Sequence, residues 1–212
     1  MPTLACVTSS AVALETLGEP VGRWPRAERL RAEDRRDFLA ARQLTVALAT
    51  RLTGRSWAAT DLHQSCGTCG GVDHGKPALG TLSVSWSHAA GTVAAAVSDD
   101  RRVAIDIQRI ADAPAVREVL AETSAGGGAD PVSAWVVREA LVKLGVVSLS
   151  EAVTLSGREV AALAAPGSIS WVDPTTECCV ALGVRRRLPA KSPHQPEIVD
   201  IIALGHPASP EA

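Results

Sequence analysis

Residues 82–108, with the sequence LSVSWSHAAGTVAAAVSDDRRVAIDIQ, decide the fold class. At residues 82–87 apolar residues alternate strictly with serines, which is the period-two pattern of a strand with one buried face. Residues 92–97 and 102–108 predict two further strands, joined by a turn at residues 98–100. In the last of these strands Asp106 and Gln108 share one face, opposite the branched apolar residues. The stretch therefore predicts three consecutive strands.

Helices are predicted on either side of these three strands. At residues 37–52 apolar residues recur at helical spacing, and Gly54 ends the helix. A second helix is predicted from Ser133, as its N-cap, to about residue 144. Its expected buried stripe comprises Ala134, Val137, Leu141 and Leu144.

Three more strands are predicted at residues 168–172, 178–184 and 197–204. The order of a helix followed by strands thus occurs twice along the chain. This order predicts an α+β fold with an N-terminal half at residues 1–98 and a C-terminal half at residues 99–205. The Pro-containing tail at residues 206–212 is predicted to be disordered.

Composition narrows the class of function. The 212 residues are 46% hydrophobic, which is enough for a proper core, and the net charge of −2 comes from charges mixed along the chain. Such a balance gives the chain no overall excess of positive charge with which to bind nucleic acid or an anionic membrane. Without a long apolar run, a basic leader or an even cysteine count, the sequence predicts a cytoplasmic protein with reduced thiols.

Four polar residues could form a site for a hard cation. Asp106 and Gln108 lie on one strand face, and Glu139 and Lys143 lie four residues apart on one helix face. A strand carboxylate facing a helix carboxylate would suit Mg²⁺, which prefers one or two carboxylates with phosphate oxygens and water. The ordinary alternative is a solvated Glu–Lys surface pair and an aspartate engaged in a turn.

Phosphate contacts are predicted at two other places. Ser87 and His88 close a strand just before a glycine, and Lys76 stands beside flexible backbone in a Gly-Lys-Pro sequence. Only three of the 21 basic residues are lysines, and two of these three are Lys76 and Lys143. A compact ammonium is therefore expected to matter at both positions.

The order of the motifs adds a resemblance to these observations. Arg42 on the first helix is followed by HGKPAL, SWSHAAGTVAAAV, VAIDIQ and WVVREALVKLG. This succession resembles that of the Sfp-type 4'-phosphopantetheinyl transferases, over about residues 35–145. The resemblance implies two pseudo-twofold related α+β halves, a site in the cleft between them, and a monomer.

The resemblance also implies an activity and roles for the matching residues. It implies Mg²⁺-dependent transfer of the 4'-phosphopantetheine of coenzyme A to a serine of an acyl or peptidyl carrier protein, in polyketide or nonribosomal peptide biosynthesis. Arg42, Lys76, Ser87, His88 and Lys143 would contact coenzyme A. The implied magnesium ligands are Asp106, Glu139 and Gln108, and the implied catalytic residues are Glu139, Lys143 and Asp106.

Several positions depart from the family pattern. Gln108 replaces the second acidic residue, which should lower magnesium affinity, and Arg138 replaces the usual lysine before Glu139. Residues 107–138 are also a short connection, which should reduce the carrier-binding surface. These departures keep two alternatives open: a carrier-binding or scaffold protein without transfer activity, and an enzyme repurposed for another substrate.

A second possible metal site precedes Lys76. His63, Cys66, Cys69 and His74 form the pattern H-x2-C-x2-C-x4-H, and these are the ligand types that zinc prefers. The alternative is a reduced, glycine-rich loop without metal.

Overall fold

The computed structural model describes residues 3–22, 24–67, 69–122, 130–164, 168–186 and 197–198. Its α-helices are α1 (Ser10–Leu17), α2 (Ala32–Thr53), α3 (Ala113–Glu122), α4 (Pro131–Lys143), α5 (Leu149–Thr154) and α6 (Gly157–Ala164). Its strands are β1 (Leu4–Ser9), β2 (His63–Ser65), β3 (Lys76–Ala78), β4 (Ser83–Ala89), β5 (Thr92–Ser98), β6 (Arg101–Arg109), β7 (Ser168–Asp173), β8 (Cys178–Arg186) and β9 (Glu197–Ile198). Short 3₁₀ turns are η1 (Ala27–Arg29), η2 (Ala59–Asp61) and η3 (Ile110–Asp112). The protein is therefore of the mixed α+β class, as the sequence predicts.

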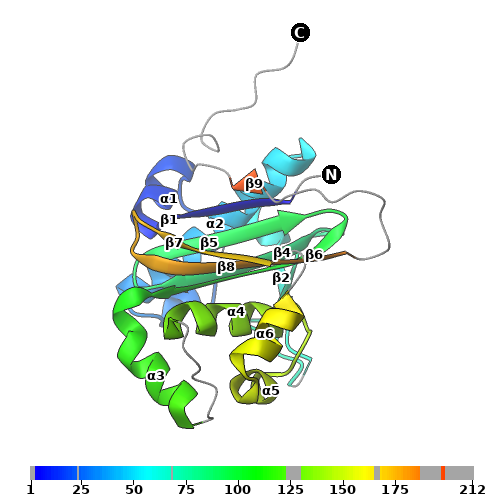
Figure 1. The fold of residues 1–212 in the computed structure, drawn as a ribbon. Coiled ribbons are helices and arrows are strands. Elements are labelled where there is room, and N and C mark those ends of the chain that lie inside the picture. Colours follow the sequence, from blue (N-terminus) through cyan, green and yellow to red (C-terminus); the bar gives the residue numbers. More distant parts are fainter. Residues whose placement is uncertain are drawn as a thin grey trace.

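The strands form two main sheets and a small hairpin. One sheet has the order β4-β5-β1-β9, in which β1 and β9 pair in parallel and the other neighbours are antiparallel. The second sheet is antiparallel with the order β6-β8-β7, and β2 pairs with β3 (Figure 1). The three predicted strands are present as β4, β5 and β6, each within two residues of its predicted ends, and β6 belongs to the second sheet instead of pairing with β5. The predicted tail at residues 206–212 lies outside the described residues.

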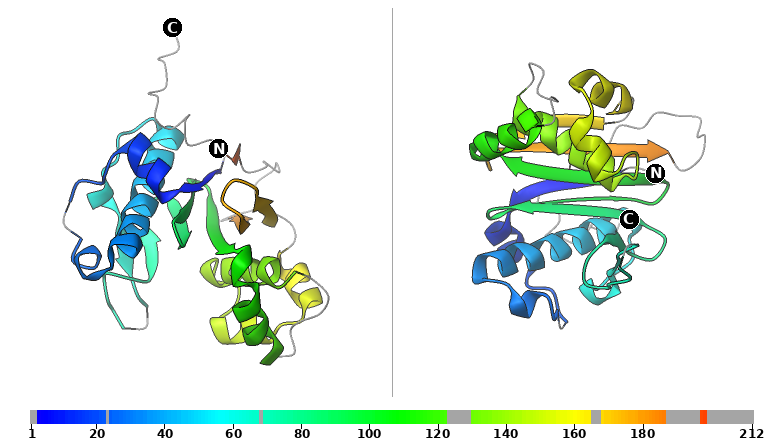
Figure 2. Two further views of the ribbon diagram at one scale, coloured as in Figure 1. Left: turned by 90° about the vertical axis from the view of Figure 1, so that its left-hand side faces the viewer. Right: turned by 90° about the horizontal axis from the view of Figure 1, so that it is seen from below.

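The two sheets pack between two sets of helices (Figure 2). Helices α1 and α2 cover one face of the four-stranded sheet, and α4 covers the outer face of the three-stranded sheet. Between the sheets lie branched residues of β6 and β8 and small residues of β5, among them Ala94 and Ala96. These alanines allow the sheets to approach closely while the core stays apolar.

Helix α4 differs from its prediction in its start and in its buried face. Asp130, rather than Ser133, is the N-cap: its side chain accepts a hydrogen bond from Ser133 N, and proline occupies the first turn. The residues that pack against the sheet are Val132, Val136, Ala140 and Leu144. Of the four residues predicted to be buried, Leu141 and Leu144 are buried. Ala134 is only partly buried because it faces α3 instead.

Helix α3 occupies the short connection between β6 and α4. Its residues Val116 and Leu120 are buried against Ala134 and Trp135 of α4. The connection therefore contains a ten-residue helix, which the sequence prediction missed.

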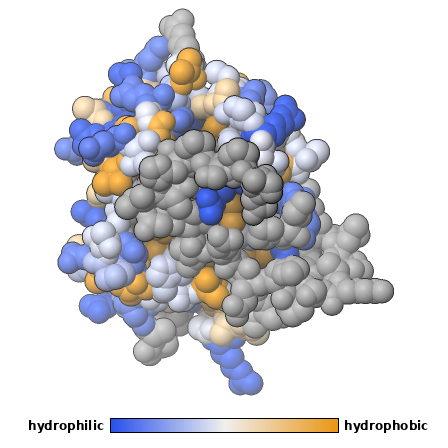
Figure 3. Space-filling view, turned by 90° about the horizontal axis from the view of Figure 1, so that it is seen from above, coloured by the Kyte–Doolittle hydropathy of each residue, from blue (hydrophilic) through white to orange (hydrophobic). Residues whose placement is uncertain are grey.

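None of the described helices combines the length and the apolarity that a membrane crossing needs. On the face drawn in Figure 3, the hydrophobic side chains of the described residues form small groups among hydrophilic ones.

Candidate functional site

A row of hydrogen bonds joins β4 to β6, which belong to different sheets. Ser83 Oγ accepts a hydrogen bond from Val103 N at 3.1 Å, and Ser85 Oγ accepts one from Ile105 N at 3.1 Å. The partners advance together along both strands, so the strands run in parallel and are joined through serine side chains. We call this contact the serine seam. The alternating serines that the sequence shows thus face a neighbouring strand.

The seam ends at a cluster of three predicted site residues. Ser87 Oγ donates a hydrogen bond to Asp106 Oδ1 at 2.8 Å, and Lys143 Nζ donates to the same oxygen at 2.7 Å. The ammonium also donates to Ile105 O at 3.0 Å and to Trp86 O at 3.3 Å. Asp106 is 3% exposed, whereas the Lys143 side chain is 31% exposed. The C-terminal end of α4 therefore brings a cation to a buried carboxylate where β4 and β6 meet.

Glu139 lies one helical turn before Lys143 and is half-buried. Burial raises the pKa of its carboxyl, the charge of Asp106 raises the pKa further, and Lys143 opposes this. The two carboxyl groups are thus close enough to repel each other. A divalent cation bound between them would relieve this repulsion, so the pair fits the hard oxygen site that the sequence predicts.

The Gln108 side chain is bonded elsewhere. Its amide nitrogen donates to Asp112 Oδ2 at 2.5 Å, and Asp112 also accepts from Arg109 Nη2 at 2.7 Å. Gln108 therefore points its nitrogen toward η3, and Asp112, which sequence reasoning missed, fixes its orientation.

His88 follows the cluster on β4 and faces a buried acid. Its Nδ1 lies 4.0 Å from Asp37 Oδ2, and Asp37 accepts hydrogen bonds from Ser10 Oγ and Gly91 N. Burial lowers the pKa of His88, and the nearby charges of Lys143 and Arg42 lower it further, against Asp37. Asp37 was missed, although an acidic residue on the apolar stripe of a predicted helix was a signal for it.

Arg42 is a buried cation held by aromatic rings. It is 4% exposed, its Cζ lies 3.2 Å from the centroid of the Phe38 ring, and Trp24 and Trp86 also flank it. It donates to Phe38 O and Gln64 Oε1, and no carboxylate among the described residues pairs with it. Burial, with the charge of Arg26, lowers its pKa to about 9. An anionic ligand would stabilise such an uncompensated charge.

Three cavities lie in a row beside these residues, and adjacent cavities share lining residues. The first, of about 330 Å³, is lined by Arg26, Arg29 and Arg42. Trp24 Nε1 is buried nearby and has no hydrogen-bond partner among the described residues. Gln64 and Trp86 line both this cavity and the next. Asp73 also lines this cavity and is bonded to Arg29, so Arg42 is the cation there that an anion would neutralise.

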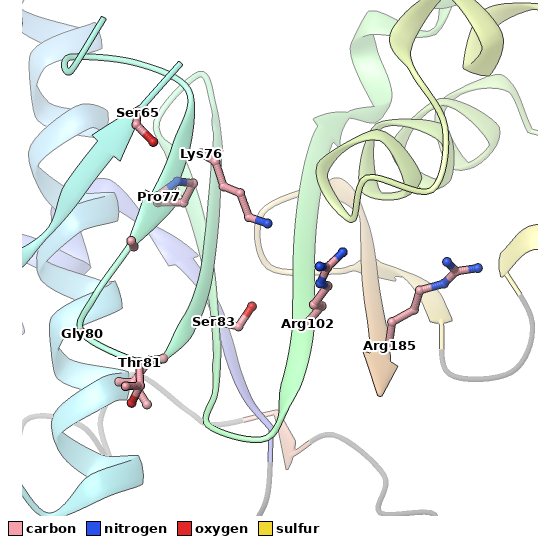
Figure 4. A pocket seen from close by; sticks show the side chains of 10 residues that line it. Ser65, Lys76, Pro77, Gly80, Thr81, Ser83, Arg102 and Arg185 are labelled. Atoms are coloured by element: carbon pink, nitrogen blue, oxygen red, sulfur yellow. The ribbon is translucent and has the colours of Figure 1, made fainter. Parts of the chain in front are cut away.

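The second and third cavities share Lys76 and Arg102. The second, of about 410 Å³, also contains Lys143 in its lining, and the third, of about 650 Å³, contains Arg185. In Figure 4, Lys76 extends from β3 across the third cavity toward Arg102 of β6. No aspartate or glutamate among the described residues lines either cavity. The row therefore offers an elongated, cationic path whose middle cavity lies beside the Asp106 cluster.

The structure thus brings together most of the predicted site residues. Ser87, Asp106 and Lys143 are in direct contact, Glu139 and His88 interact with them electrostatically, and Arg42 and Lys76 line adjoining cavities. No protein-family model matches the chain, and no curated protein matches it significantly in sequence. The residues and their geometry therefore carry the functional argument.

Proposed function

We propose that this protein transfers the 4'-phosphopantetheine of coenzyme A to a serine of an acyl or peptidyl carrier protein, on a transferase fold of two pseudo-twofold related halves. The observation that carries the proposal is the meeting of Ser87, Asp106 and Lys143 at the end of the serine seam, with Glu139 beside them. This is the set of residues that the motif order singles out. We place the reaction in the cytoplasm and expect a monomer.

Coenzyme A is an elongated polyanion, and the row of cavities suits such a ligand. Phosphate groups would be neutralised by Arg42 in the first cavity and by Lys76 and Lys143 in the second. The charges of Lys143 and Arg42 act on His88, and its lowered pKa favours a neutral imidazole that can donate a hydrogen bond to phosphate oxygen.

The chain's own residues would activate the carrier serine and hold the leaving group. The serine oxygen forms a bond to the phosphorus of the phosphopantetheine, and the bond from that phosphorus to the bridging pyrophosphate oxygen breaks. The bridging oxygen keeps the electron pair, so adenosine 3',5'-bisphosphate departs against Lys143. Glu139 takes the serine proton, for which its raised pKa makes it a better base than an ordinary glutamate.

Magnesium held by Asp106 and Glu139 would supply charge neutralisation for the pyrophosphate. Two contacts lower the expected affinity for the metal. Lys143 Nζ already donates to Asp106 Oδ1, and Gln108 is a neutral amide whose nitrogen is bonded to Asp112. We therefore expect magnesium to bind weakly in the absence of coenzyme A.

The same two contacts favour one alternative function. A protein that binds a carrier without modifying it would have no need of a metal, and a permanent Lys143–Asp106 pair would then stabilise the fold. In that case coenzyme A, the carrier or both would bind, and no transfer would follow. An enzyme repurposed for another substrate would retain His88 and lose coenzyme A binding.

Intact-mass analysis of apo carrier proteins tests the proposal. Several acyl and peptidyl carriers are incubated with the full chain, coenzyme A and Mg²⁺, and calorimetry measures coenzyme A binding in parallel. Glu139→Gln removes the proton acceptor and keeps the side-chain shape. Glu15→Gln, at an exposed position on α1, is the matched control.

We expect a mass gain of one phosphopantetheine on at least one carrier with the wild-type and Glu15→Gln proteins. Loss of the proton acceptor should reduce the rate by about 100-fold or more in the Glu139→Gln variant. Binding of coenzyme A without any adduct would favour the carrier-binding alternative. No adduct together with no coenzyme A binding would refute the proposal.

A further inference from the structure

Outside this site, the turn between β2 and β3 gathers two thiols and an imidazole. One ligand atom from each of Cys66, Cys69 and His74 lies within 4.8 Å of the other two. His74 Nε2 is 3.2 Å from Cys69 Sγ. His63, the fourth residue of the sequence pattern, lies on β2 and is not a member of this group. The structure therefore brings together three of the four residues of the pattern.

Backbone hydrogen bonds and a glycine in this turn leave room for the side chains of Cys69 and His74 to meet. Gly70 N donates a hydrogen bond to Cys66 O at 2.9 Å, and Cys66 N donates to Gly71 O at 2.9 Å. A Cβ atom at Gly71 would lie 2.5 Å from His74 Cε1 and 3.3 Å from Cys69 Sγ. A side chain at position 71 would therefore push the imidazole away, and the glycine leaves the space in which the imidazole and the thiol meet.

Asp73 orients the imidazole toward the thiols. Its Oδ1 lies 2.7 Å from His74 Nδ1, so Nε2 is the ring nitrogen that faces Cys69. In metal sites a carboxylate commonly holds the non-ligating nitrogen of a histidine in this way, which fixes the ring and raises its basicity as a ligand. The group thus has the supporting contact of a metal site as well as the ligands.

We propose that Cys66, Cys69 and His74 bind a zinc ion, with Asp73 as the residue that positions His74. Two thiolates and one imidazole suit zinc and exclude magnesium and calcium, which take oxygen ligands. Three protein ligands leave a fourth tetrahedral position, and the exposed Cys69 lets water fill it. His63 is not a ligand.

Through Asp73, the turn that would hold the zinc contacts the segment around η1. Asp73 also accepts a hydrogen bond from Arg29 Nη2 at 3.3 Å, and Arg26 Nη1 donates to Asp73 O at 3.1 Å. Both arginines line the first cavity, and the chain reaches Lys76 of β3 two residues after His74. Fixing the turn would therefore fix one wall of the cavity row, whatever ligand this row takes.

Metal analysis of the full chain tests the proposal without any activity assay. We expect about one zinc ion per chain after expression in zinc-supplemented medium. Cobalt(II) added to the chelator-treated protein should give a sulfur-to-metal charge-transfer band with the intensity of two thiolate ligands. Cys69→Ser should lose both the zinc and this band, and His74→Ala should lose the zinc. His63→Ala, the matched histidine control, should retain the zinc.

The backbone amides provide a second readout in the wild-type protein. Chelation should speed hydrogen exchange at Cys66 N and Gly70 N, because the metal holds the turn that protects them. No zinc in the wild-type protein and no thiolate band with cobalt(II) would overturn the proposal. Equal zinc in the wild-type and Cys69→Ser proteins would also overturn it. Loss of zinc in His63→Ala would overturn the three-ligand assignment.

Discussion

Replacing Lys143 by methionine tests whether the contact at the end of the serine seam holds the two sheets together. Methionine keeps the long apolar stem and removes the ammonium, which donates to Asp106 and to carbonyl oxygens of β4 and β6. The variant therefore leaves the buried Asp106 carboxylate with the Ser87 hydroxyl as its remaining hydrogen-bond donor among the described contacts.

The magnitude follows from the burial of the two partners. Removing one partner of a fully buried ion pair costs about 3 to 5 kcal/mol. The Lys143 side chain is 31% exposed, so water screens the pair, and we discount this contribution to about 2 kcal/mol. Loss of the two hydrogen bonds to carbonyl oxygens adds about 1 kcal/mol. We therefore expect Lys143→Met to lower the free energy of unfolding by about 3 kcal/mol.

Urea unfolding followed by tryptophan fluorescence measures this free energy. The matched control is Lys76→Met, because Lys76 is an exposed lysine on β3, and its replacement should change stability by less than about 0.5 kcal/mol. Asp106→Asn and the double variant complete a double-mutant cycle. The coupling free energy between positions 106 and 143 should be about 2 kcal/mol, because the neutral amide removes the uncompensated charge.

A loss below about 0.5 kcal/mol in Lys143→Met, or a coupling free energy near zero, would refute this account of the seam. The ammonium would then be solvated rather than paired with Asp106, and available to a ligand without loss of fold stability. The cycle thus also measures the free energy that a metal ion must supply to displace Lys143 from Asp106.

Three further predictions concern neighbouring residues. The raised pKa of Glu139 means that the folded protein binds a proton more tightly than the unfolded chain, so stability declines as the pH rises from the ordinary glutamate range through the raised value. Glu139→Gln should abolish this decline in urea unfolding and stabilise the fold at neutral pH by less than about 1 kcal/mol. Ala90 has a φ of 42°, in the left-handed region, so Ala90→Asn should raise the free energy of unfolding by about 0.5 to 1 kcal/mol, and a decrease would contradict the turn geometry. The buried Arg138 donates to carbonyl oxygens of α4, α5 and the residue after α5, so Arg138→Met should lower the midpoint of thermal unfolding with a loss of about 2 to 3 kcal/mol; an unchanged midpoint would refute that role.

Elements with a clear periodicity could be predicted from the sequence. Helix α2 and strands β4 to β6 have regular patterns bounded by Gly54 and by the turn at residues 98–100, and the structure contains all of them. Strand β1 was missed because its residues, LACVTS, are covered on both faces and show no alternation. A central strand of this kind is visible only through its partners β5 and β9, which are distant in the sequence.

The sequence predicts which residue types form the candidate site. It predicts only some of the contacts between them. Spacing placed Asp106 on one strand face and Glu139 with Lys143 on one helix face, and the structure shows these elements in contact. Spacing could not show that Arg138 turns inward, because a long side chain on a helix ordinarily reaches water. Arg138 is buried because carbonyl oxygens from α5 and its following residue accept its hydrogen bonds.

The position of the cluster follows from how the two sheets meet. Along the seam, Ser83 and Ser85 accept hydrogen bonds from backbone amides of β6. This contact requires a small side chain with an acceptor oxygen at every second residue of β4. At Ser87 the hydroxyl turns to the Asp106 side chain, so the backbone of β6 is no longer held directly by β4. The strands can separate there, and Lys143 reaches the carbonyl oxygens of both. The Asp106 carboxylate, the Ser87 hydroxyl and the Lys143 ammonium thus meet where the side-chain contact between the two sheets ends, which places a site at that end of the seam.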